Sequence, residues 1–396
     1  MRLDRQSSRS RDAEATGGGS RPAVSGMAGG GPGAPPLLPP GGPSVTQLAH
    51  PGEQGPAVRR ASPETGHDRR AGAAPTVSVI MPAYRVTEYI GAALDSVFAQ
   101  TFTDYEIIVV NDGCPDTAAL EQVLGPYLDR IVYLKQENRG VASARNTAIR
   151  ASRGRYLALL DPDDLWEPTY LAVQLAIMER DPTLDVVYPD ALLFGEHANA
   201  GRTYMEVCPS DGEVTFERVA TAQCQVMVSV LARRSAVVGA GLFDESLRSS
   251  EDFDLWLRLL NHGGRIAYHR QVLARYRLRP GSLSSDPIRM YESAVRVLEK
   301  ADRTFPLRPE ERASLRRHRA YLAAMCRLSE GKRAFLHDDR AAARKALADA
   351  NSYFRSARIR LILVLLRFAP RLLRDLYGLR EKLRERVRGR RSGTSP

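Results

Sequence analysis

The chain has 396 residues, 43% of them hydrophobic, and a formal net charge of +11, so it is long enough for one large domain with an appendage. The positive excess is concentrated at one end, because residues 351–396 hold thirteen Arg or Lys against three Asp or Glu. A basic tail on an otherwise nearly neutral chain argues against specific nucleic-acid binding by the whole protein.

The four cysteines are Cys114, Cys208, Cys224 and Cys326, and they form no CxxC or Cys/His spacing. We therefore expect no disulfide framework and no zinc site, as is usual in a reducing compartment. Residues 1–20 lack the apolar segment of a signal peptide, and no apolar run reaches the ~18 residues of a spanning helix. We expect a cytoplasmic protein, with peripheral attachment to the inner face of the cell membrane as a further option.

Residues 1–74 are rich in Gly, Pro, Ser, Ala and Arg and show no apolar periodicity. Such a segment cannot bury enough apolar surface to offset its ordering entropy. We predict that it is disordered, and we assign no function to it.

From residue 77 onward, apolar strands alternate with helices at the spacing of βαβ units. The predicted strands are 77–84, 105–110, 131–135 and 156–160, and the predicted helices between them are 88–100, 117–128 and 141–152. This alternation predicts an α/β domain with a mostly parallel sheet covered by helices. Ligands of such sheets bind at the carboxyl ends of the strands, where Tyr84, Asp112 and Asp161 fall.

The second half of the domain is less regular. We predict a helix from residue 168 to 179, strands at 185–189, 226–232 and 272–278, an irregular stretch at 192–213, and an amphipathic helix at 253–261. Beyond residue 290 the pattern is helical. Residues 291–354 place Gly331, Ala343, Leu347 and Ala350 at the small and apolar positions of a tetratricopeptide-like hairpin. One such unit cannot form a solenoid, so we predict a helical appendage on the main domain.

Residues 355–396 alternate Leu and Arg and predict a basic amphipathic helix. Two interpretations remain open for this tail. In the first interpretation the tail lies on an anionic membrane surface. In the second it is a solvated helix that packs its leucine stripe on the domain.

The apolar run Tyr156 to Leu160 ends at three carboxylates, Asp161, Asp163 and Asp164. Crowded anions repel one another unless a positive group lies among them, and a hard divalent cation carrying a phosphorylated ligand is one such partner. The alternative interpretation is a helix start, with Asp164 or a neighbour as its N-cap.

Six motifs occur in one order: VSVIMPAY, VVNDGCPD, ENRGVASARNTAI, LALLDPDDLW, SSEDFDLWLRL and YRLRPGSLS. Together they resemble the family 2 glycosyltransferases over roughly residues 76–290. The resemblance implies a GT-A nucleotide-diphospho-sugar transferase fold over residues 75–290. It also implies inverting transfer of a sugar from a nucleotide-diphosphate donor to the hydroxyl of a sugar, lipid-linked sugar or protein, in polysaccharide, glycolipid or glycoprotein synthesis.

On the donor side, the resemblance implies that Asp112 accepts a hydrogen bond from the nucleobase. The alternative for Asp112 is an Asx turn with Gly113. The resemblance further implies that a strand-end segment lines the nucleotide, and this segment is Pro82, Ala83 and Tyr84. Tyr84 could also belong to the core.

The aspartate cluster resembles the DxD motif of the family. By this resemblance, Asp161 with Asp163 or Asp164 would bind Mg²⁺ or Mn²⁺, and the metal would hold the donor diphosphate. Arg139 and Arg145 are expected to face the cluster or a phosphate. An ion pair that only orders the loop is the alternative for Arg145.

On the acceptor side, Glu251 and Asp252 match the "ED" pair of the family, whose Asp is the catalytic base of inverting members. We expect Asp252 to be the base, with Glu251 as the second candidate. The alternative is a helix N-terminus that Ser249 or Ser250 caps and that places acids in its first turn. Trp256 could stack on an acceptor sugar or belong to the core.

The last motif departs from many relatives, which carry a His near the metal and phosphates. This chain has Arg277, Arg279 and Ser282 there. A guanidinium cannot ligate a metal, but it can neutralise a diphosphate through paired hydrogen bonds. We expect these three residues to bind substrate.

Two other functional classes remain as alternatives. One is a non-catalytic, membrane-associated protein that binds a nucleotide sugar. The other is a nucleotidyltransferase, although the Gly-rich loop expected after the first strand of that class is missing.

Overall fold

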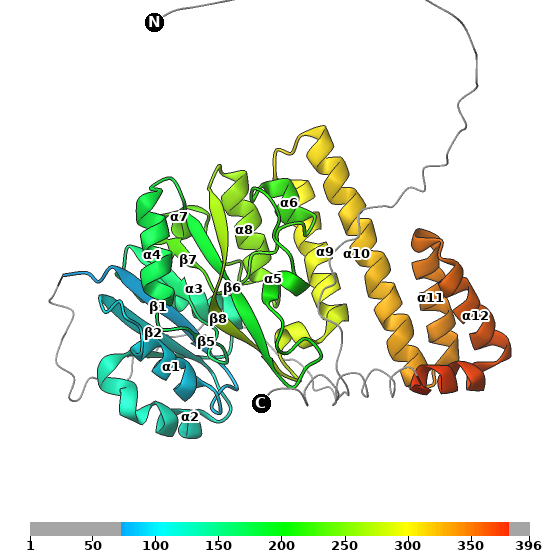
Figure 1. Cartoon of the computed structure of the whole chain (residues 1–396), viewed down its shortest axis with the longest axis horizontal. Coiled ribbons are helices and arrows are strands. Elements are labelled where there is room, and N and C mark those ends of the chain that lie inside the picture. The colour runs from blue at the N-terminus through cyan, green and yellow to red at the C-terminus, as the bar shows by residue number, and fades with distance from the viewer. Residues whose placement is uncertain (1–72, 380–396) are drawn as a thin grey trace, which may run out of the picture. The chain divides into compact units, whose positions relative to one another are not determined.

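The computed structural model describes residues 73–379 (Figure 1). Residues 1–72 of the predicted disordered segment and residues 380–396 of the basic tail lie outside the described residues.

The domain is built on an eight-stranded sheet with the order β3-β2-β1-β4-β7-β6-β8-β5. The strands are β1 (Val77–Ala83), β2 (Tyr105–Asp112), β3 (Val132–Gln136), β4 (Tyr156–Leu159), β5 (Leu165–Trp166), β6 (Val186–Gly195), β7 (Leu231–Arg233) and β8 (Ile266–Leu278). Strands β1 to β4 pair in parallel, as do β6 and β8, whereas β7 is antiparallel to both of its neighbours. The predicted α/β fold with a mostly parallel sheet is therefore confirmed.

The named helices fall into two groups, α1 to α8 along the sheet domain and α9 to α12 after it. They are α1 (Ile90–Phe98), α2 (Thr117–Leu124), α3 (Val141–Ala151), α4 (Tyr170–Arg180), α5 (Tyr204–Val207), α6 (Phe216–Ala220), α7 (Arg234–Gly239), α8 (Glu251–Asn261), α9 (Pro287–Thr304), α10 (Pro309–Leu336), α11 (Arg340–Phe354) and α12 (Ala357–Phe368), with short 3₁₀ helices at Gly125–Arg130 and Leu283–Ser285. Helix α3 packs on β1 and β2, and α4 packs on β6 and β7. Every residue of β1 is buried, which is why that strand reads as a continuous apolar run rather than an alternating one.

The strand register sets where the polar residues of the sheet edge meet. Strands β1 and β2 pair from Val77 opposite Tyr105 to Ala83 opposite Asn111, so the two strands end at the same edge of the sheet. The neighbouring β4 runs parallel to β1 and ends at Leu159. The residues that follow these three strands therefore gather at one edge.

Several predicted elements differ from the structure. Strand β8, for example, begins at Ile266 and not at residue 272. Strand β6 continues to Gly195, into the stretch predicted to be irregular, because it pairs with β8 along most of its length. The predicted strand 226–232 forms only at Leu231–Arg233. Residues 226–228 are apolar because they are buried in the wall of a cavity, and no strand forms there.

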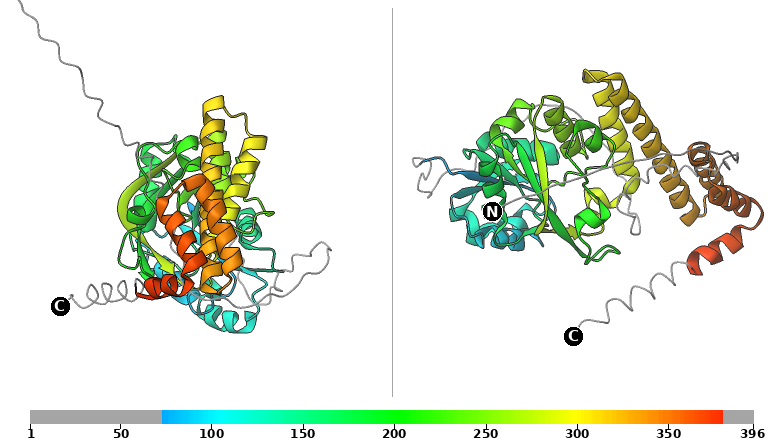
Figure 2. Two further views of the ribbon diagram at one scale, coloured as in Figure 1. Left: turned by 90° about the vertical axis from the view of Figure 1, so that its right-hand side faces the viewer. Right: turned by 45° about the horizontal axis from the view of Figure 1, so that its top comes forward.

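The C-terminal helices follow the sheet domain. Helix α9 packs on α8, α10 packs on α9 and α6, and α11 packs on α10, beside which it lies in both views of Figure 2. Gly331 allows the close approach of α10 to α11, because a Cβ there would lie 2.7 Å from the Cγ atom of Leu347. Within residues 73–379, no helix has the length and apolarity needed to cross a membrane.

Candidate active site

A cavity of about 770 Å³ lies at the carboxyl ends of the strands. With the exception of Arg139, each residue that the sequence singled out contributes to its wall. These residues are Pro82, Ala83, Tyr84, Asp112, Arg145, Asp161, Asp163, Asp164, Glu251, Asp252, Trp256, Arg277, Arg279 and Ser282. The fold thus brings residues from six separate motifs to one site.

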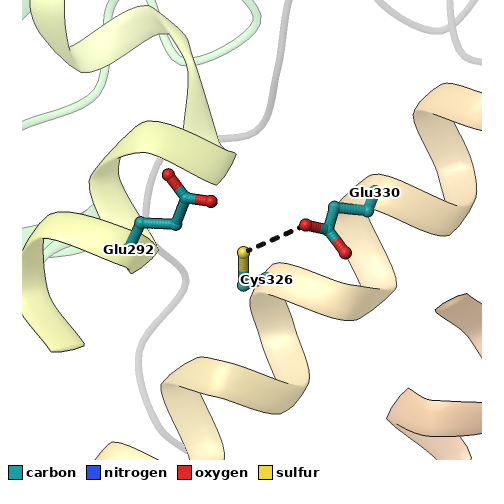
Figure 3. Close-up of side chains that lie close together, drawn as sticks. All are labelled: Glu292, Cys326 and Glu330. Carbon is teal, nitrogen blue, oxygen red and sulfur yellow. Dashed lines mark hydrogen bonds between the residues drawn. The ribbon is translucent and has the colours of Figure 1, made fainter.

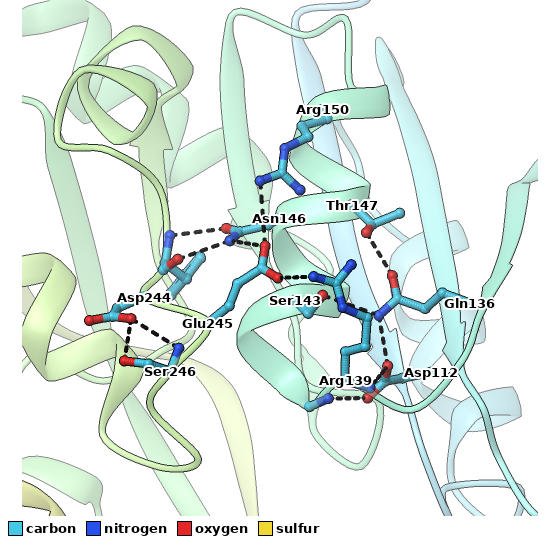
Figure 4. Close-up of polar contacts among 12 residues, drawn as sticks. Asp112, Gln136, Arg139, Ser143, Asn146, Thr147, Arg150, Asp244, Glu245 and Ser246 are labelled. Carbon is cyan, nitrogen blue, oxygen red and sulfur yellow. Dashed lines mark hydrogen bonds and ion pairs between the residues drawn. The ribbon is translucent and has the colours of Figure 1, made fainter. Parts of the chain in front are cut away.

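Asp112 is buried at the end of β2 and is held by three donors (Figure 4). Its Oδ1 atom accepts hydrogen bonds from Gln136 Nε2 at 2.7 Å and from the Arg139 backbone at 2.9 Å. Its Oδ2 atom accepts one from the Gly140 backbone at 2.8 Å. This carboxylate therefore fixes the segment that leads into α3 and presents its remaining acceptor capacity to the cavity.

The Asx turn considered for Asp112 belongs to its neighbour. The Oδ1 atom of Asn111 accepts a hydrogen bond of 2.8 Å from the Cys114 backbone. Gly113 completes this turn with φ of +63°, and a Cβ there would lie 2.5 Å from the backbone nitrogen of Asn138. The turn and the segment before α3 are therefore in direct contact.

Arg139 departs from the prediction. Its guanidinium donates to Glu245, with 2.8 Å between Nη2 and Oε2 (Figure 4), and its side chain does not contribute to the cavity wall. Glu245 also accepts a hydrogen bond of 3.0 Å from Asn146, on α3. An anionic partner on the loop before α8 thus draws Arg139 away from the aspartate cluster.

The aspartates form a tight turn, with the Asp164 backbone donating to the Asp161 carbonyl at 2.9 Å. The next helix is α4, which begins at Tyr170, so the interpretation of Asp164 as an N-cap is wrong. Asp164 is buried and accepts a hydrogen bond of 2.7 Å from the Arg277 backbone. Burial, with the charges of Asp163 and Asp161, raises the pKa of Asp164 well above its ordinary value.

Arginines supply positive charge among the three carboxylates. Arg145 Nη2 lies 2.7 Å from Asp161 Oδ1, and Arg279 Nε lies 2.7 Å from Asp163 Oδ2. Each of these ion pairs uses one oxygen of its aspartate and leaves the other for a further partner. Two carboxylates at a cavity wall form an all-oxygen donor set of the kind that Mg²⁺ and Mn²⁺ accept.

Arg145 joins the two acidic motifs of the site. Its side chain is 3% exposed, and its Nη1 atom lies 2.5 Å from Oε1 of Glu251, on α8. Burial acts to lower the pKa of Arg145, but the charges of Asp161, Glu251 and Asp252 raise it above its ordinary value. Arg145 therefore remains charged, and its ion pairs are structural as well as electrostatic links between the donor side and α8.

The two acids of the "ED" pair have different surroundings. Glu251 is committed to Arg145, whereas the Oδ1 atom of Asp252 accepts a hydrogen bond of 2.8 Å from the Phe253 backbone. Burial and the charge of Glu251 raise the pKa of Asp252 to about 7, against the opposing charge of Arg145. Asp252 is therefore the carboxylate of the pair that can exchange a proton near neutral pH.

The capping alternative for this pair is right about position, because α8 carries Glu251, Asp252 and Asp254 in its first turn, but it is wrong about the capping hydrogen bond. Ser250 is the N-cap of α8, but its side chain makes no capping hydrogen bond, and its backbone is left-handed with φ of +59°. The Ser249 hydroxyl is buried and finds no hydrogen-bond partner among the described residues. Backbone strain at the residue before Glu251 is typical of functional sites, because it is kept only where the surroundings enforce it.

Four further predicted residues line the cavity. Tyr84 is 39% exposed, which excludes it from the core, whereas Trp256 is 1% exposed and is both core and wall. The Ser282 hydroxyl lies 3.4 Å from that of Ser284. The Arg277 guanidinium lies over the ring of Tyr89, with 4.7 Å between its central carbon and the ring centroid.

Sequence reasoning missed several residues that shape the site. Gln136 and Asn111 stand at the ends of β3 and β2, and a polar residue at the end of a buried strand is the signal that could have identified them. Gln225 and Tyr276 also line the cavity. Gln225 lies outside the six motifs, and Tyr276 opens the motif YRLRPGSLS but was given no role there, so only the tertiary structure shows their place.

A second group of potential ligands lies between α9 and α10 (Figure 3). Glu292, Cys326 and Glu330 bring ligand atoms within 4.8 Å of one another. Burial raises the pKa of the Cys326 thiol to about 11, with a further contribution from Glu330, and Glu330 pairs with Arg327 at 2.8 Å. A protonated thiol and a paired carboxylate are poor ligands, and we assign no metal to this group.

Comparisons with known proteins agree with this site. The family model described as Glycosyl transferase family 2 matches residues 78–204. RP339 of Rickettsia prowazekii, described as an uncharacterized glycosyltransferase, is 30% identical over 225 residues, which cover 55% of this chain and 69% of RP339. EpsJ of Bacillus subtilis, described in the same way, is 32% identical over 226 residues, which cover 54% of this chain and 64% of EpsJ.

The fold also has a counterpart among solved structures. Residues 1–349 of TarS from S. aureus superpose with a TM-score of 0.51 at 17% identity, and the match covers 71% of this chain and 91% of that one. TarS has also been solved in complex with UDP-GlcNAc. The fold and the site define a nucleotide-sugar-dependent glycosyltransferase. The chain belongs to the family 2 glycosyltransferases.

Proposed function

We propose that this enzyme transfers the sugar with inversion, with Asp252 as the catalytic base. The observation that carries the proposal is the difference between the two acids of α8. Glu251 is held by Arg145, whereas Asp252 lies at the cavity wall with a pKa of about 7. Asp252 takes the proton of the acceptor hydroxyl while the hydroxyl oxygen bonds to the anomeric carbon. The bond between the anomeric carbon and the diphosphate breaks on the opposite side of that carbon.

We further propose that Asp161 and Asp163 hold a divalent cation, Mg²⁺ or Mn²⁺. Each has a carboxylate oxygen that its arginine does not use. Such a cation, when bound, neutralises the departing nucleoside diphosphate. Arg279 and Arg277 lie at the same wall and bind the diphosphate directly, so donor binding weakens in EDTA but persists. Asp164 instead holds the turn, because it is buried against the Arg277 backbone.

The donor class is tested first by thermal shift with UDP-, GDP- and dTDP-sugars in Mg²⁺, Mn²⁺ or EDTA, because a ligand that binds the native state raises the melting temperature. UDP-GlcNAc is the first probe, since TarS binds it. The activity assay then measures release of the nucleoside diphosphate from the donor that binds. Stabilisation that EDTA leaves unchanged would contradict the metal assignment.

Asp252→Asn tests the base. We expect turnover to fall by roughly 10²- to 10⁴-fold while the donor-induced thermal shift is kept, because the amide cannot take a proton. In the wild type, kcat/KM should rise with pH through about 7, where Asp252 loses its proton. Asp349→Asn, on the exposed surface of α11, is the matched control and should be fully active. Unchanged turnover of D252N would refute the assignment.

A stripe of exposed apolar side chains supports peripheral membrane binding. It is defined by Leu361, Val364, Phe368, Leu372, Leu376 and Leu379, which follow one another at three- and four-residue spacing. Ile359 and Leu366 are buried, and α12 packs on α11. One face of α12 therefore packs on the protein while another is free, and we propose that the free face lies on an anionic membrane near a lipid-linked or envelope acceptor.

Sedimentation with vesicles tests the membrane proposal. The protein should co-sediment with vesicles of phosphatidylglycerol and much less with vesicles of phosphatidylcholine, because its basic residues are attracted to anionic lipid. The double variant Leu361→Gln, Phe368→Gln should lose binding. Leu128→Gln is the control, because Leu128 is equally an exposed leucine but lies outside the stripe. Equal binding by both variants would contradict the proposal.

The alternative of a non-catalytic nucleotide-sugar-binding protein makes a separate prediction. A donor-induced thermal shift without nucleotide release, to water or to any acceptor offered, would favour it over transfer.

A further inference from the structure

Two arginines of the cavity wall have no acidic partner. Arg248 precedes α8 and Arg289 lies in the first turn of α9, and both are exposed side chains that line the cavity. Arg145 and Arg279, by contrast, are each held by an aspartate of the cluster. Within residues 73–379, no carboxylate forms an ion pair with either of the two exposed arginines. Their charges are therefore available to a ligand in the cavity.

The two arginines lie beside the segment that leads into α8. Arg248 immediately precedes Ser249, and its Nη1 atom donates a hydrogen bond of 3.2 Å to the Arg139 carbonyl. Arg289 lies one helical turn before Ser293, whose hydroxyl donates a hydrogen bond of 2.5 Å to the Ser249 carbonyl. Residues four positions apart share a face of a helix, so Arg289 stands on the face of α9 that meets this segment. Two guanidiniums are therefore present near the start of the helix that carries the proposed base.

The acids of α8 do not neutralise these two arginines. Glu251 pairs with Arg145, and Asp254 pairs with Lys300 at 2.7 Å. For the third acid of the helix, Asp252, burial and the charge of Glu251 raise the pKa to about 7, so it is partly protonated at neutral pH. Positive charge is therefore in excess at this part of the wall, and an anionic ligand would complement it.

We propose that Arg248 and Arg289 bind an anionic group of the acceptor, so that the acceptor is a sugar that carries a carboxylate or a phosphate. This inference rests on the proposed transfer function and specifies the class of acceptor. A guanidinium forms paired, charge-assisted hydrogen bonds with the oxygens of either group. The bound anion anchors the acceptor beside α8 and leaves a sugar hydroxyl free to meet Asp252.

Acceptor binding can be measured while the donor half of the site is occupied. The protein is saturated with Mg²⁺ and with whichever of UDP, GDP and dTDP raises its melting temperature most, so that a probe cannot take the place of the diphosphate. If none of the three raises it, the titrations are made with Mg²⁺ alone. The probes are 4-nitrophenyl β-D-glucoside, its 6-phosphate and the matching glucuronide, which share an aglycone and differ in charge.

Isothermal titration calorimetry gives the three affinities. At least one anionic probe should bind at least about tenfold more tightly than the neutral glucoside, because charge-assisted hydrogen bonds are added. Tighter binding of the glucuronide indicates a uronic acid acceptor, and tighter binding of the 6-phosphate indicates a phosphorylated one. If both anionic probes bind no more tightly than the glucoside, or do not bind measurably, the proposal is overturned.

Arg289→Gln separates this subsite from the general surface charge. The variant should reduce the preference for the anionic probe to about threefold or less, and Arg248→Gln should act in the same direction. Arg296→Gln is the matched control, because Arg296 is an exposed arginine of the same helix that does not line the cavity. The control should keep the full preference. An equal loss in R289Q and R296Q would assign the preference to overall charge and refute the subsite.

The same variant tests whether Arg289 instead binds the donor. Arg289→Gln should leave the thermal shift induced by the nucleoside diphosphate unchanged. Arg279→Gln should reduce that shift, because Arg279 lies beside Asp163 at the proposed diphosphate site. Loss of the shift in R289Q would place Arg289 at the donor diphosphate and overturn its assignment to the acceptor.

The outcomes separate the two proposals. A preference for anionic probes without nucleotide release from any donor would refute the transfer function and leave the anion subsite standing. Nucleotide release that the anionic probes stimulate no more than the neutral glucoside would refute the anionic acceptor and leave the transferase standing.

Discussion

Arg145 pairs with two acidic motifs whose paired residues, Asp161 and Glu251, are 90 positions apart in the chain. Removing one partner of a buried ion pair leaves the other charge uncompensated, at a cost of about 3–5 kcal/mol. The loop-ordering alternative and the functional interpretation of Arg145 are therefore not exclusive. The same guanidinium orders the site and restrains the pKa of Asp252.

Asp252 should make the stability of the protein depend on pH. Its pKa is about 7 in the folded state and about 3.9 in an unfolded chain, so the folded protein binds more protons between these values. Stability contributed by protonated Asp252 is therefore present at low pH and is lost as pH rises toward 7. Asp252→Asn should raise the melting temperature by several degrees at pH 8 and by less at pH 5, because the amide carries no charge.

Melting curves by circular dichroism at the two pH values measure this effect. Asp349→Asn again serves as the control, since its carboxylate is exposed on α11. An identical shift for D252N at pH 5 and pH 8 would show that the charge of Asp252 carries no folding penalty.

At the scale of single residues, sequence reasoning identified the residue types but not their partners. Asp161, Asp163 and Asp164 were recognised as needing positive charge, and the structure supplies it with Arg145 and Arg279. Which arginine pairs with which acid depends on strand order and side-chain direction. For the same reason, Glu245 could not be foreseen as the partner of Arg139.

Among the secondary-structure elements, the turn after β2 controls how the carboxylate of Asp112 is held. Gly113→Ala should lower stability by about 1–2 kcal/mol, because an L-residue is strained at its positive φ. The new methyl group would also displace Asn138 and the Asp112-bound segment after it, and donor binding should weaken. Denaturant unfolding and the donor-induced thermal shift measure the two effects.

Gly125→Ala is the matched control for this turn. Gly125 has an ordinary φ of −44° and open space where a Cβ would stand. Alanine there should be neutral or slightly stabilising, because it restricts the unfolded chain. Equal effects of the two substitutions would contradict the role of the turn after β2.

The elements predicted best were those of the first βαβ units, where β1 and β4 are buried along their whole length. The short β5 and helix α7 were missed, and β7 was predicted only at its first two residues, because these elements are fixed by tertiary pairing. Buried apolar segments without regular structure, such as residues 226–228, have the composition of strands. At residues 226–228, composition therefore predicted burial correctly and the backbone conformation wrongly.

For the molecule as a whole, the reactivity of the four cysteine thiols measures how often the folded protein unfolds. Cys114, Cys208, Cys224 and Cys326 are all buried and free, and burial raises the pKa of each, to about 12 for Cys208. Since the thiolate is the reactive form, 4,4′-dithiodipyridine at pH 7.5 should label the native protein slowly and all four thiols at once in guanidinium chloride. A thiol that reacts at the rate of a free peptide in the native protein would contradict this.

The antiparallel pairing of β4 with β7 also has a consequence for folding. Strand β7 joins β4 across 77 positions, from Tyr156 to Arg233, and β4 joins β1 across 79, from Val77 to Tyr156. Strands β1 and β2 and strands β2 and β3 pair across only 28 and 24 positions. Contacts between residues distant in sequence form late, because the chain entropy of closing the loop opposes them. During refolding, β1, β2 and β3 should therefore pair before β4 and β7 join them, and nucleotide binding and sugar transfer should return together with that later step.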